Sequence, residues 1–493
     1  MPIKENEKTL SSNVAHGAFW VIISYSFSNI LYFLRTFILI RLLSPIDFGL
    51  MGVANVVIDM FNRFTETGIG MALVQKKEIN KATLDTAWII TFVRGAVLFV
   101  LLYLFSPLVA NFYNSTQLNN ILKFISLCFL FNGIASIGVS LFVKELNFKD
   151  KAIFEQTSAV TNTIVSIALA IIFKNVWALV IGHIIGTIVG SVFSYILYPF
   201  RPSLNFSLNE ARGLFCFGKY VFASVVVTFF VVRGPDALVG KVLGLGSLGF
   251  YVAAFGIANI PATSVTHLIS QITLPAYAKL RDDLPTLRDG YLKVTRLIAF
   301  LSTPIAGGIF MLIPEFVQIF LGTKWMPIVV PVRILCIFGF FRSIYTAMSP
   351  VLYAVGRPDL EFKITSLNLV ATAILIYPFT RAMGIAGTSM VFSLVGTMCM
   401  FVAGSLIYRL VRLNEAGAQF FKDIIFPLVG TLFMCLFIFL IKPWFSYRSA
   451  MSFMALILMG GGLYILPLYF FDKYFNYGLV DTIRFAVVSF KKR

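Results

Sequence analysis

Fourteen apolar segments follow one another along almost the whole chain, and this pattern decides what the chain can fold into. Most of them hold the roughly 20 residues that a helix needs to cross the hydrocarbon core of a bilayer. In lipid a chain must satisfy its own backbone hydrogen bonds, so apolar runs of this length predict helices. The segments are 17–40, 47–74, 84–107, 117–140, 153–173, 176–198, 214–238, 247–272, 291–317, 327–355, 361–380, 384–408, 423–441 and 449–470.

The composition agrees with a membrane protein that has almost no soluble part. Hydrophobic residues make up 58% of the chain and charged residues 13%, and the mean hydropathy is +0.88. Soluble domains carry roughly a quarter charged residues. The loops are short, the longest at about 278–290, so no catalytic domain outside the membrane is expected. The five cysteines show no CxxC spacing and the three histidines form no HExxH cluster, so we predict neither a metal nor a cofactor.

Lys and Arg residues between the segments alternate between the two sides of the predicted membrane. When the N-terminus is placed in the cytoplasm, the cytoplasmic side holds 25 of them and the other side 7. This asymmetry predicts that the N-terminus and the C-terminus are both cytoplasmic. It also accounts for much of the net charge of +18, because a basic rim is attracted to anionic lipid. We therefore predict no binding to nucleic acid.

A short internal repeat suggests a duplicated architecture. The segments 41–49 (RLLSPIDFG) and 241–249 (KVLGLGSLG) are 200 residues apart, and each opens an apolar segment from the same predicted side. Chance similarity between Leu-rich and Gly-rich segments is the alternative. A true repeat predicts an all-α polytopic membrane protein of about 14 transmembrane helices with two six-helix lobes in parallel. The predicted parts are an N-terminal lobe (1–198), a cytoplasmic linker (199–213), a C-terminal lobe (214–408), and two further helices with a basic tail (409–493).

Arginines inside the apolar segments are the first candidates for function, because charges within membrane helices are costly. Arg63, Arg94 and Arg342 fall near the middle of their segments, whereas Arg35 and Arg233 lie toward the outer ends. Guanidinium groups match phosphate oxygens, so these five residues are the predicted binding groups for an anionic substrate. The alternative is that they extend to the membrane surface or pair with another helix.

Three acids accompany the arginines. Asp59, Arg63 and Glu66 share one helix face, which is expected to line a cavity or to pack on a partner helix. An ion pair within that helix is the alternative. Asp236 stands three residues after Arg233 and can pair with it. The three acids are the candidates for charge balance, or for coupling transport to a proton or sodium gradient.

Two further patterns concern helix packing and sugar binding. Gly182, Gly186 and Gly190 form a run of small residues that predicts close packing against a neighbouring helix. Polar residues recur every four positions within the segment 247–272, where they contact either a glycan or a neighbouring helix. The candidate glycan contacts are Asn55, Asn259, His267 and Gln271.

Five segments carry a family resemblance that spans about 41–363. They are RLLSPIDFG (41–49), TGIGMALVQKKEI (67–79), LPAYAKLRDD (274–283), GTKW (322–325) and GRPD (356–359). Together they resemble the polysaccharide transporters, or oligosaccharide flippases, of the multidrug/oligosaccharidyl-lipid/polysaccharide superfamily, and among these the colanic-acid and exopolysaccharide type. The matching motifs do not reach the arginines named above, which are assigned from the helix pattern alone.

The resemblance implies a transporter that is not an enzyme. It would flip undecaprenyl-pyrophosphate-linked oligosaccharide repeat units across the bacterial inner membrane, for exopolysaccharide or lipopolysaccharide biosynthesis, by alternating access through a cationic central cavity. Coupling to an ion gradient is also implied. We expect a monomer whose partners are the lipid-linked oligosaccharide, membrane lipid and, as a candidate, a polysaccharide polymerase. The two C-terminal helices are expected to shape a groove for the lipid tail.

Three other functions remain open from the sequence. A flippase for peptidoglycan lipid precursors would also need a cationic cavity. A multidrug exporter of the same superfamily would favour an acidic cavity, because its substrates are cationic. A membrane oligosaccharide polymerase would be an enzyme with a large periplasmic loop, whereas the longest outside loop here has only about ten residues.

Overall fold

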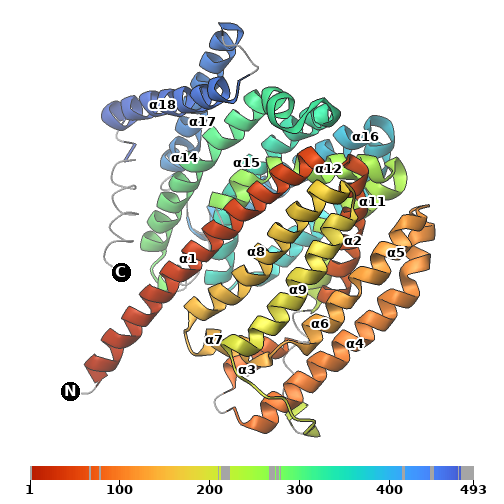
Figure 1. Cartoon of the computed structure of the whole chain (residues 1–493). Coiled ribbons are helices and arrows are strands. Elements are labelled where there is room, and N and C mark those ends of the chain that lie inside the picture. The colour runs from red at the N-terminus through yellow and green to blue at the C-terminus, as the bar shows by residue number, and fades with distance from the viewer. Residues whose placement is uncertain are drawn as a thin grey trace. The chain divides into compact units, whose positions relative to one another are not determined.

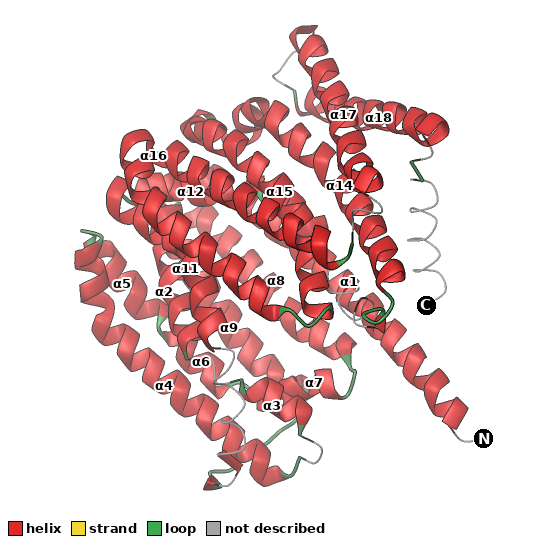
Figure 2. Ribbon diagram, turned by 180° about the vertical axis from the view of Figure 1, so that it is seen from behind, coloured by secondary structure: helices red, strands yellow, loops and turns green. Residues whose placement is uncertain are grey.

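Every regular element that the structure describes is a helix, as Figure 2 shows. The structure is a computed structural model, and it describes residues 3–65, 68–76, 79–208, 210–211, 222–265, 273, 277, 279–412, 417–444, 449–475 and 477–478. Within these ranges nine helices are long and apolar enough to cross a membrane, or ten if the bent pair Thr116–Ile134 and Ile137–Lys144 forms one span. The predicted all-α polytopic membrane fold is confirmed.

The chain divides into two compact units, Met1–Gly249 and Phe250–Arg493. The division falls within the helix α12 (Leu245–Ala258) and not in the predicted linker. The lobes 1–198 and 214–408 therefore stay a prediction, and each unit is described by itself.

The first unit is a helix bundle whose members pack along one another. Its elements are α1 (Ile3–Leu42), α2 (Pro45–Phe64), α3 (Ile69–Gln75), α4 (Lys81–Phe112), α5 (Thr116–Ile125), α6 (Leu127–Ile134), η1 (Ile137–Ser140), α7 (Leu141–Lys144), α8 (Phe148–Phe173), α9 (Trp177–Leu197), α11 (Phe222–Leu243) and the start of α12. In Figure 1, α8 runs beside α1 and α9, and α4 runs beside α5 and α6. The α11 helix packs against α2, which brings a helix of the predicted C-terminal lobe onto one of the N-terminal lobe.

Small residues on α9 allow its close contact with α8. A Cβ atom on Gly186 would stand only 2.8 Å from the Cβ of Asn162, and one on Gly190 would stand 3.1 Å from the Cβ of Ser158. The predicted close packing of this run is therefore confirmed.

The second unit surrounds one central helix, α15. Its elements are the rest of α12, η3 (Pro261–Val265), α14 (Leu284–Phe316), η4 (Val317–Leu321), η5 (Thr323–Ile328), α15 (Val329–Ala354), α16 (Pro358–Leu410), α17 (Gly417–Ile441), η7 (Lys442–Trp444) and α18 (Ala450–Phe475). The α15 helix packs against α14 and α16, and α17 packs against α14 and α18. Most of α15 is buried, which fits its place among the other helices.

Two predicted segments end earlier than the hydropathy pattern suggests. The segment 47–74 is divided into α2 and α3, because the chain turns through Gly68 in the left-handed region with φ of 66°. The segment 247–272 is regular only to Ala258, and a π-helical turn opens at Pro261. Proline has no N–H to continue the helical hydrogen bonds, and π-helical turns are frequent at functional sites.

Bends divide two further parts of the chain. The segments 361–380 and 384–408 are two helices that meet at a kink at Gly384, with φ of 61°, within the 53 residues of α16. A straight helix of this length would extend about 80 Å, far beyond one bilayer crossing, so the bend separates two spans. The segment 117–140 is also broken, by a bend of 74° before Ile137.

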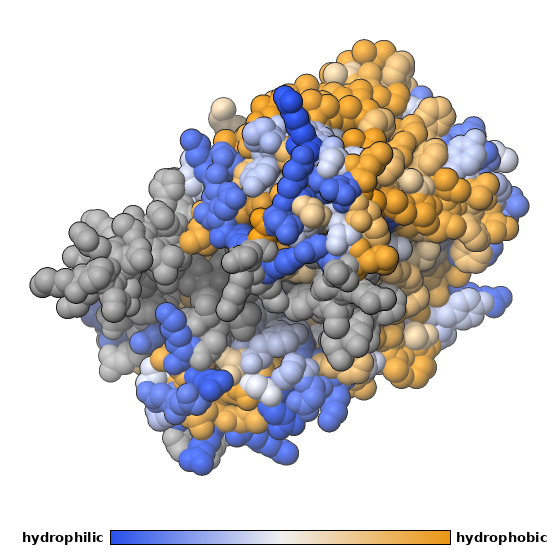
Figure 3. Space-filling view, turned by 90° about the horizontal axis from the view of Figure 1, so that it is seen from below, coloured by the Kyte–Doolittle hydropathy of each residue, from blue (hydrophilic) through white to orange (hydrophobic). Residues whose placement is uncertain are grey.

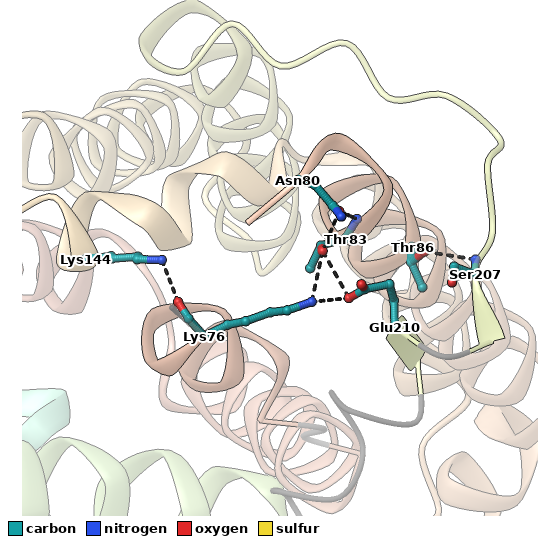
Figure 4. A network of polar contacts seen from close by, with 7 residues as sticks. All are labelled: Lys76, Asn80, Thr83, Thr86, Lys144, Ser207 and Glu210. Atoms are coloured by element: carbon teal, nitrogen blue, oxygen red, sulfur yellow. Dashed lines mark hydrogen bonds and ion pairs between the residues drawn. The ribbon is translucent and has the colours of Figure 1, made fainter. Parts of the chain in front are cut away.

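Loops that the charge pattern assigns to one side of the membrane meet at one end of the first unit (Figure 4). The ammonium group of Lys144 donates to the carbonyl of Lys76 at 2.6 Å, and Lys76 forms an ion pair with Glu210. The backbone N–H of Ser207 donates to the hydroxyl of Thr86 at 3.1 Å. The linker is therefore bound to the start of α4 and to the loop before it.

Loops assigned to the other side also meet one another. The backbone N–H of Val176 donates to Asp47 at 2.8 Å, and the hydroxyl of Tyr113 donates to the carbonyl of Ala237 at 3.2 Å. The helices of the first unit thus cross back and forth as the alternating charges require. Figure 3 looks from below at the opposite end, where α3 and α7 lie, and shows hydrophilic side chains there beside hydrophobic ones. Which end faces the cytoplasm stays a prediction.

Candidate substrate-binding site

The first copy of the repeat, segment 41–49, builds the start of α2. Ser44 caps the helix and Pro45 takes its first position, where a missing N–H is harmless. One oxygen of the Asp47 carboxylate accepts from the N–H of Ser44 at 2.9 Å, and the other accepts from the N–H of Val176 at 2.8 Å. The carboxylate of Asp47 therefore binds the starts of both α2 and α9 and fixes their relative positions along the helix axes.

The second copy of the repeat crosses the first at two glycines. A Cβ atom on Gly49 would collide with the carbonyl group of Leu245, and one on Gly249 would collide with the carbonyl group of Pro45. Shifting either contact by 200 residues gives the other contact, so the crossing is reciprocal. A two-fold axis between two equivalent helices produces such reciprocal contacts. The crossing therefore supports the parallel repeat.

Arg233 of α11 binds two carboxylates. Its Nε donates to Oδ2 of Asp59 on α2 at 2.8 Å, and its Nη1 donates to Oδ2 of Asp236 at 3.2 Å. The predicted pair with Asp236 is confirmed, but Asp59 pairs across the helices and not with Arg63 of its own helix. We call Arg233, Asp59 and Asp236 the Arg233 cluster. Its acids outnumber its base, so it holds no free positive charge.

Arg342 of α15, in the second unit, has no acid beside it among the residues that the structure describes. Its Nη1 donates to Oδ1 of Asn259 at 3.2 Å, and its guanidinium lies 5.7 Å from the centre of the Phe338 ring. The helices α15 and α12 approach closely at Gly339, where a Cβ would stand 2.5 Å from the carbonyl oxygen of Ala258. We call Arg342, Asn259 and Phe338 the Arg342 cluster. An amide cannot neutralise a guanidinium, so this cluster stays positive.

Two other candidate arginines have different surroundings. Arg63 lies in the last turn of α2 and not in the middle of a span, because α2 ends at Phe64, and its side chain is exposed. Arg94 donates from Nη2 to the carbonyl of Asn62 and from Nε to the hydroxyl of Thr65, both at 3.0 Å. It thus binds the C-terminal end of α2, where a helix favours a cation.

The remaining candidates are only partly placed. The Nε of Arg35 on α1 is buried without a hydrogen-bond partner in the described part of the chain. Asn55 is partly buried on α2. Glu66, His267 and Gln271 lie outside the described residues.

A buried ion pair in the second unit was not predicted from the sequence. The Nε of Arg296 on α14 donates to Asp423 on α17 at 2.7 Å, and its Nη1 donates to the carbonyl of Gly478 at 2.9 Å. Asp423 has no exposed surface, so the pair anchors α17 to α14 and does not face a ligand. The available signals were Asp423 at the very start of the apolar segment 423–441 and Arg296 inside the segment 291–317.

An apolar groove of about 940 Å³ lies among α14, α15, α16 and α17. Tyr408 and Arg409 are among the few polar side chains on it, and Gly404 leaves its wall without a side chain. The α18 helix contributes no lining residue in the described part of the chain, so only the first of the two predicted C-terminal helices shapes the groove. Its apolar walls include Phe310, Phe340, Phe341, Met400, Phe421 and Ile425.

These features suit the binding of a ligand. Among the described residues, no group of three or more His, Cys, Asp or Glu side chains is arranged to hold a metal ion. The guanidinium of Arg342 can bind an anion through several donors. The apolar groove can bind a hydrocarbon chain.

Comparison with known proteins identifies the family. The model of the family described as "Polysaccharide biosynthesis protein" matches residues 38–330. Lipopolysaccharide biosynthesis protein WzxC of Escherichia coli is 27% identical over 363 residues, which cover 72% of each chain. Teichuronic acid biosynthesis protein TuaB of Bacillus subtilis is 25% identical over 384 residues, which cover 77% of each chain.

A solved structure shares the fold. The lipid II flippase MurJ, in an inward closed conformation, superposes with a TM-score of 0.76 at 17% identity, covering 92% of this chain and 98% of that one. At this identity the likeness shows the fold alone. The family match confirms the resemblance predicted from the sequence and sets the polymerase alternative aside. This chain therefore belongs to the polysaccharide biosynthesis protein family, as a multi-pass membrane transporter and not an enzyme.

Proposed function

We propose that this protein flips undecaprenyl-pyrophosphate-linked oligosaccharide repeat units from the cytoplasmic to the outer leaflet of the bacterial inner membrane. The relatives named for lipopolysaccharide and teichuronic acid biosynthesis support this class of substrate. Such a cargo has an anionic head, a polar glycan and a long lipid tail. A carrier for it needs a cationic site, polar contacts and an apolar groove, with no catalytic group.

The uncompensated charge of Arg342 is the observation that carries the proposal. A pyrophosphate offers several oxygens to the planar fork of donors on a guanidinium. Of the five candidate arginines, Arg233 is neutralised by two acids and Arg94 is engaged by the end of α2. Arg342 of the second unit is therefore the group that we assign to the pyrophosphate, and Arg63 and Arg35 of the first unit stay candidates for an anion contact.

The apolar groove is proposed to hold part of the lipid tail. Gly404→Leu would add a branched side chain to the groove wall, where the nearest atom to a new Cβ is 3.5 Å away. Gly461→Leu on α18 is the matched control, because a Cβ there would meet nothing within 4 Å. Slower flipping in the first variant alone supports the assignment, and equal rates contradict it. Deleting 423–493 is a coarser test, because it also removes the Asp423 anchor.

The Arg233 cluster is the proposed site of energy coupling to a proton or sodium gradient. Asp59 and Asp236 are its two carboxylates, and a carboxylate can bind either ion. Reconstituted vesicles with an imposed proton or sodium gradient provide the test. Flipping that is indifferent to both gradients would remove coupling from the proposal. A monomer with both termini in the cytoplasm, working beside a polysaccharide polymerase, completes the proposed arrangement.

A deletion strain tests the flipping activity itself. We expect lipid-linked repeat units to accumulate in the cytoplasmic leaflet, because synthesis continues while transport stops. Accumulation of single repeat units in the outer leaflet would mean that flipping is intact, and the proposal would be wrong.

A flippase for peptidoglycan lipid precursors is the second candidate, favoured by the shared fold with MurJ. The two candidates are separated by what the deletion strain accumulates and by whether it survives. A multidrug exporter is less well supported, because the positive Arg342 cluster would repel cationic drugs.

A further inference from the structure

Asp59 and Asn259 occupy equivalent positions in the repeat. The offset of 200 residues that relates segment 41–49 to segment 241–249 also relates these two positions. The offset holds along both helices, because α2 is unbroken from Pro45 to Phe64 and the N–H of Asn259 still donates to the carbonyl of Phe255 at 3.0 Å. The reciprocal glycine crossing sets the register of the two helices about three to four turns before these residues.

Each of the two residues binds an arginine that comes from another helix. Oδ2 of Asp59 accepts a hydrogen bond from Nε of Arg233 on α11 at 2.8 Å. Oδ1 of Asn259 accepts one from Nη1 of Arg342 on α15 at 3.2 Å. The side chains of Asp and Asn have the same shape and differ in charge. The same position therefore neutralises an arginine in one half of the repeat and leaves an arginine charged in the other.

We propose that Asn259 is a specificity-determining residue, whose neutral amide orients Arg342 and leaves its full charge for the anionic group of the substrate. This inference rests on the proposed function and deepens it. A carboxylate at position 259 would hold Arg342 in the same place but would compete with the substrate for it. Asn259 therefore selects for an anionic head group.

The amide has a second use at this position. A guanidinium only donates hydrogen bonds, so the oxygen of Asn259 must face Arg342. The NH2 group of the amide is then a further donor beside the arginine, without a partner among the residues that the structure describes. A phosphate oxygen bound to Arg342 can accept from it. The guanidinium also lies 5.7 Å from the centre of the Phe338 ring, within reach of a cation–π contact.

The test compares three substitutions of Asn259 in the purified full-length chain. The probe is farnesyl pyrophosphate, with farnesol as the control that lacks the anionic group. Asn259→Asp is expected to weaken binding of farnesyl pyrophosphate about tenfold or more, because the new carboxylate would compete with the pyrophosphate for Arg342. Asn259→Ala and Asn259→Ser keep the charge of Arg342 free and are expected to weaken it about threefold or less, since each loses one neutral hydrogen bond. Asn368→Asp on α16 is the matched control and is expected to bind normally.

The outcomes distinguish this inference from the proposed function. Wild-type binding by Asn259→Asp, with binding lost in Arg342→Ala, would overturn the inference and leave the proposed anion site intact. Equal losses in the Asp, Ala and Ser variants would also overturn it, because the hydrogen bond and not the charge would then matter. Undiminished binding by Arg342→Ala would instead contradict the proposed anion site. Thermal unfolding of each variant shows that it is folded.

Discussion

The Arg233 cluster and the Arg342 cluster place the same kind of side chain against positions 59 and 259, which are equivalent in the proposed repeat, yet their charges differ. Arg233 meets two carboxylates, whereas Arg342 meets an amide oxygen and an aromatic ring. A neutralised arginine stabilises the packing of α11 on α2. An arginine that keeps its charge contributes less to stability but can attract a ligand. The comparison shows how one helix arrangement supports two different tasks.

Arg342→Ala is expected to have the largest effect on transport. Surface polysaccharide should fall at least about tenfold, because the removed charge has no replacement in its cluster. The amount of protein in the membrane should stay the same, since no acid is left unpaired. Arg342→Lys keeps a charge without the fork of donors and should be intermediate. A wild-type amount of surface polysaccharide in Arg342→Ala would show that the Arg342 cluster has no role in transport.

Gly49→Leu tests the alignment on which the comparison depends. Its side chain would overlap the backbone of Leu245, which cannot rotate away, so stability should fall by about 3 kcal/mol. Gly246→Leu is the matched control, because the nearest atom to a Cβ there is 3.6 Å away. Thermal unfolding in detergent gives the difference. If both variants unfolded at the same temperature, the helices would not cross at Gly49.

Arg233→Ala should lower stability by about 1–3 kcal/mol, because it leaves two carboxylates without their partner. Adding Asp59→Asn to this variant should recover part of the loss. Arg342→Ala, by contrast, should leave the free energy of unfolding nearly unchanged. Denaturation of all three proteins in the same detergent provides the measurement. If Arg233→Ala and Arg342→Ala lowered the free energy of unfolding equally, the two clusters would not differ in their contribution to stability.

The smallest expected effect concerns Glu210, which lies outside both clusters. The ammonium of Lys76 and the hydroxyl of Thr83 donate to its carboxylate and hold its pKa below the ordinary value of 4.5. A lowered pKa contributes stability that is present above pH 4.5 and is lost as the pH falls through the folded-state value. The pair is partly exposed, so we expect about 0.5 kcal/mol.

Thermal unfolding of wild type and Glu210→Gln across pH measures this contribution. The difference between the two proteins should be present at pH 7 and should disappear below pH 4.5. A difference that grew as the pH fell would show that Glu210 is not held in its charged form.

Much of the fold was predictable, because span length and charge are local properties of the chain. The breaks were less so. The segment 247–272 is long enough for one membrane span, yet its regular helix ends before Pro261. The break at Gly384 was predicted, because the apolar segments 361–380 and 384–408 meet there, but the positive φ of this glycine was not. The sequence could not show which arginines lack a carboxylate partner, because the partners lie on other helices.

The sequence alone determined that this chain is a polytopic helical membrane protein, it pointed to the family, and it suggested a repeat. Only the tertiary structure decided that Asp59 binds Arg233 while Asn259 binds Arg342. The reason is physical. Hydrophobic length sets where a helix crosses the membrane, but the partner of a side chain depends on how closely two helices pack. In this protein that approach is controlled by glycines such as Gly49 and Gly339.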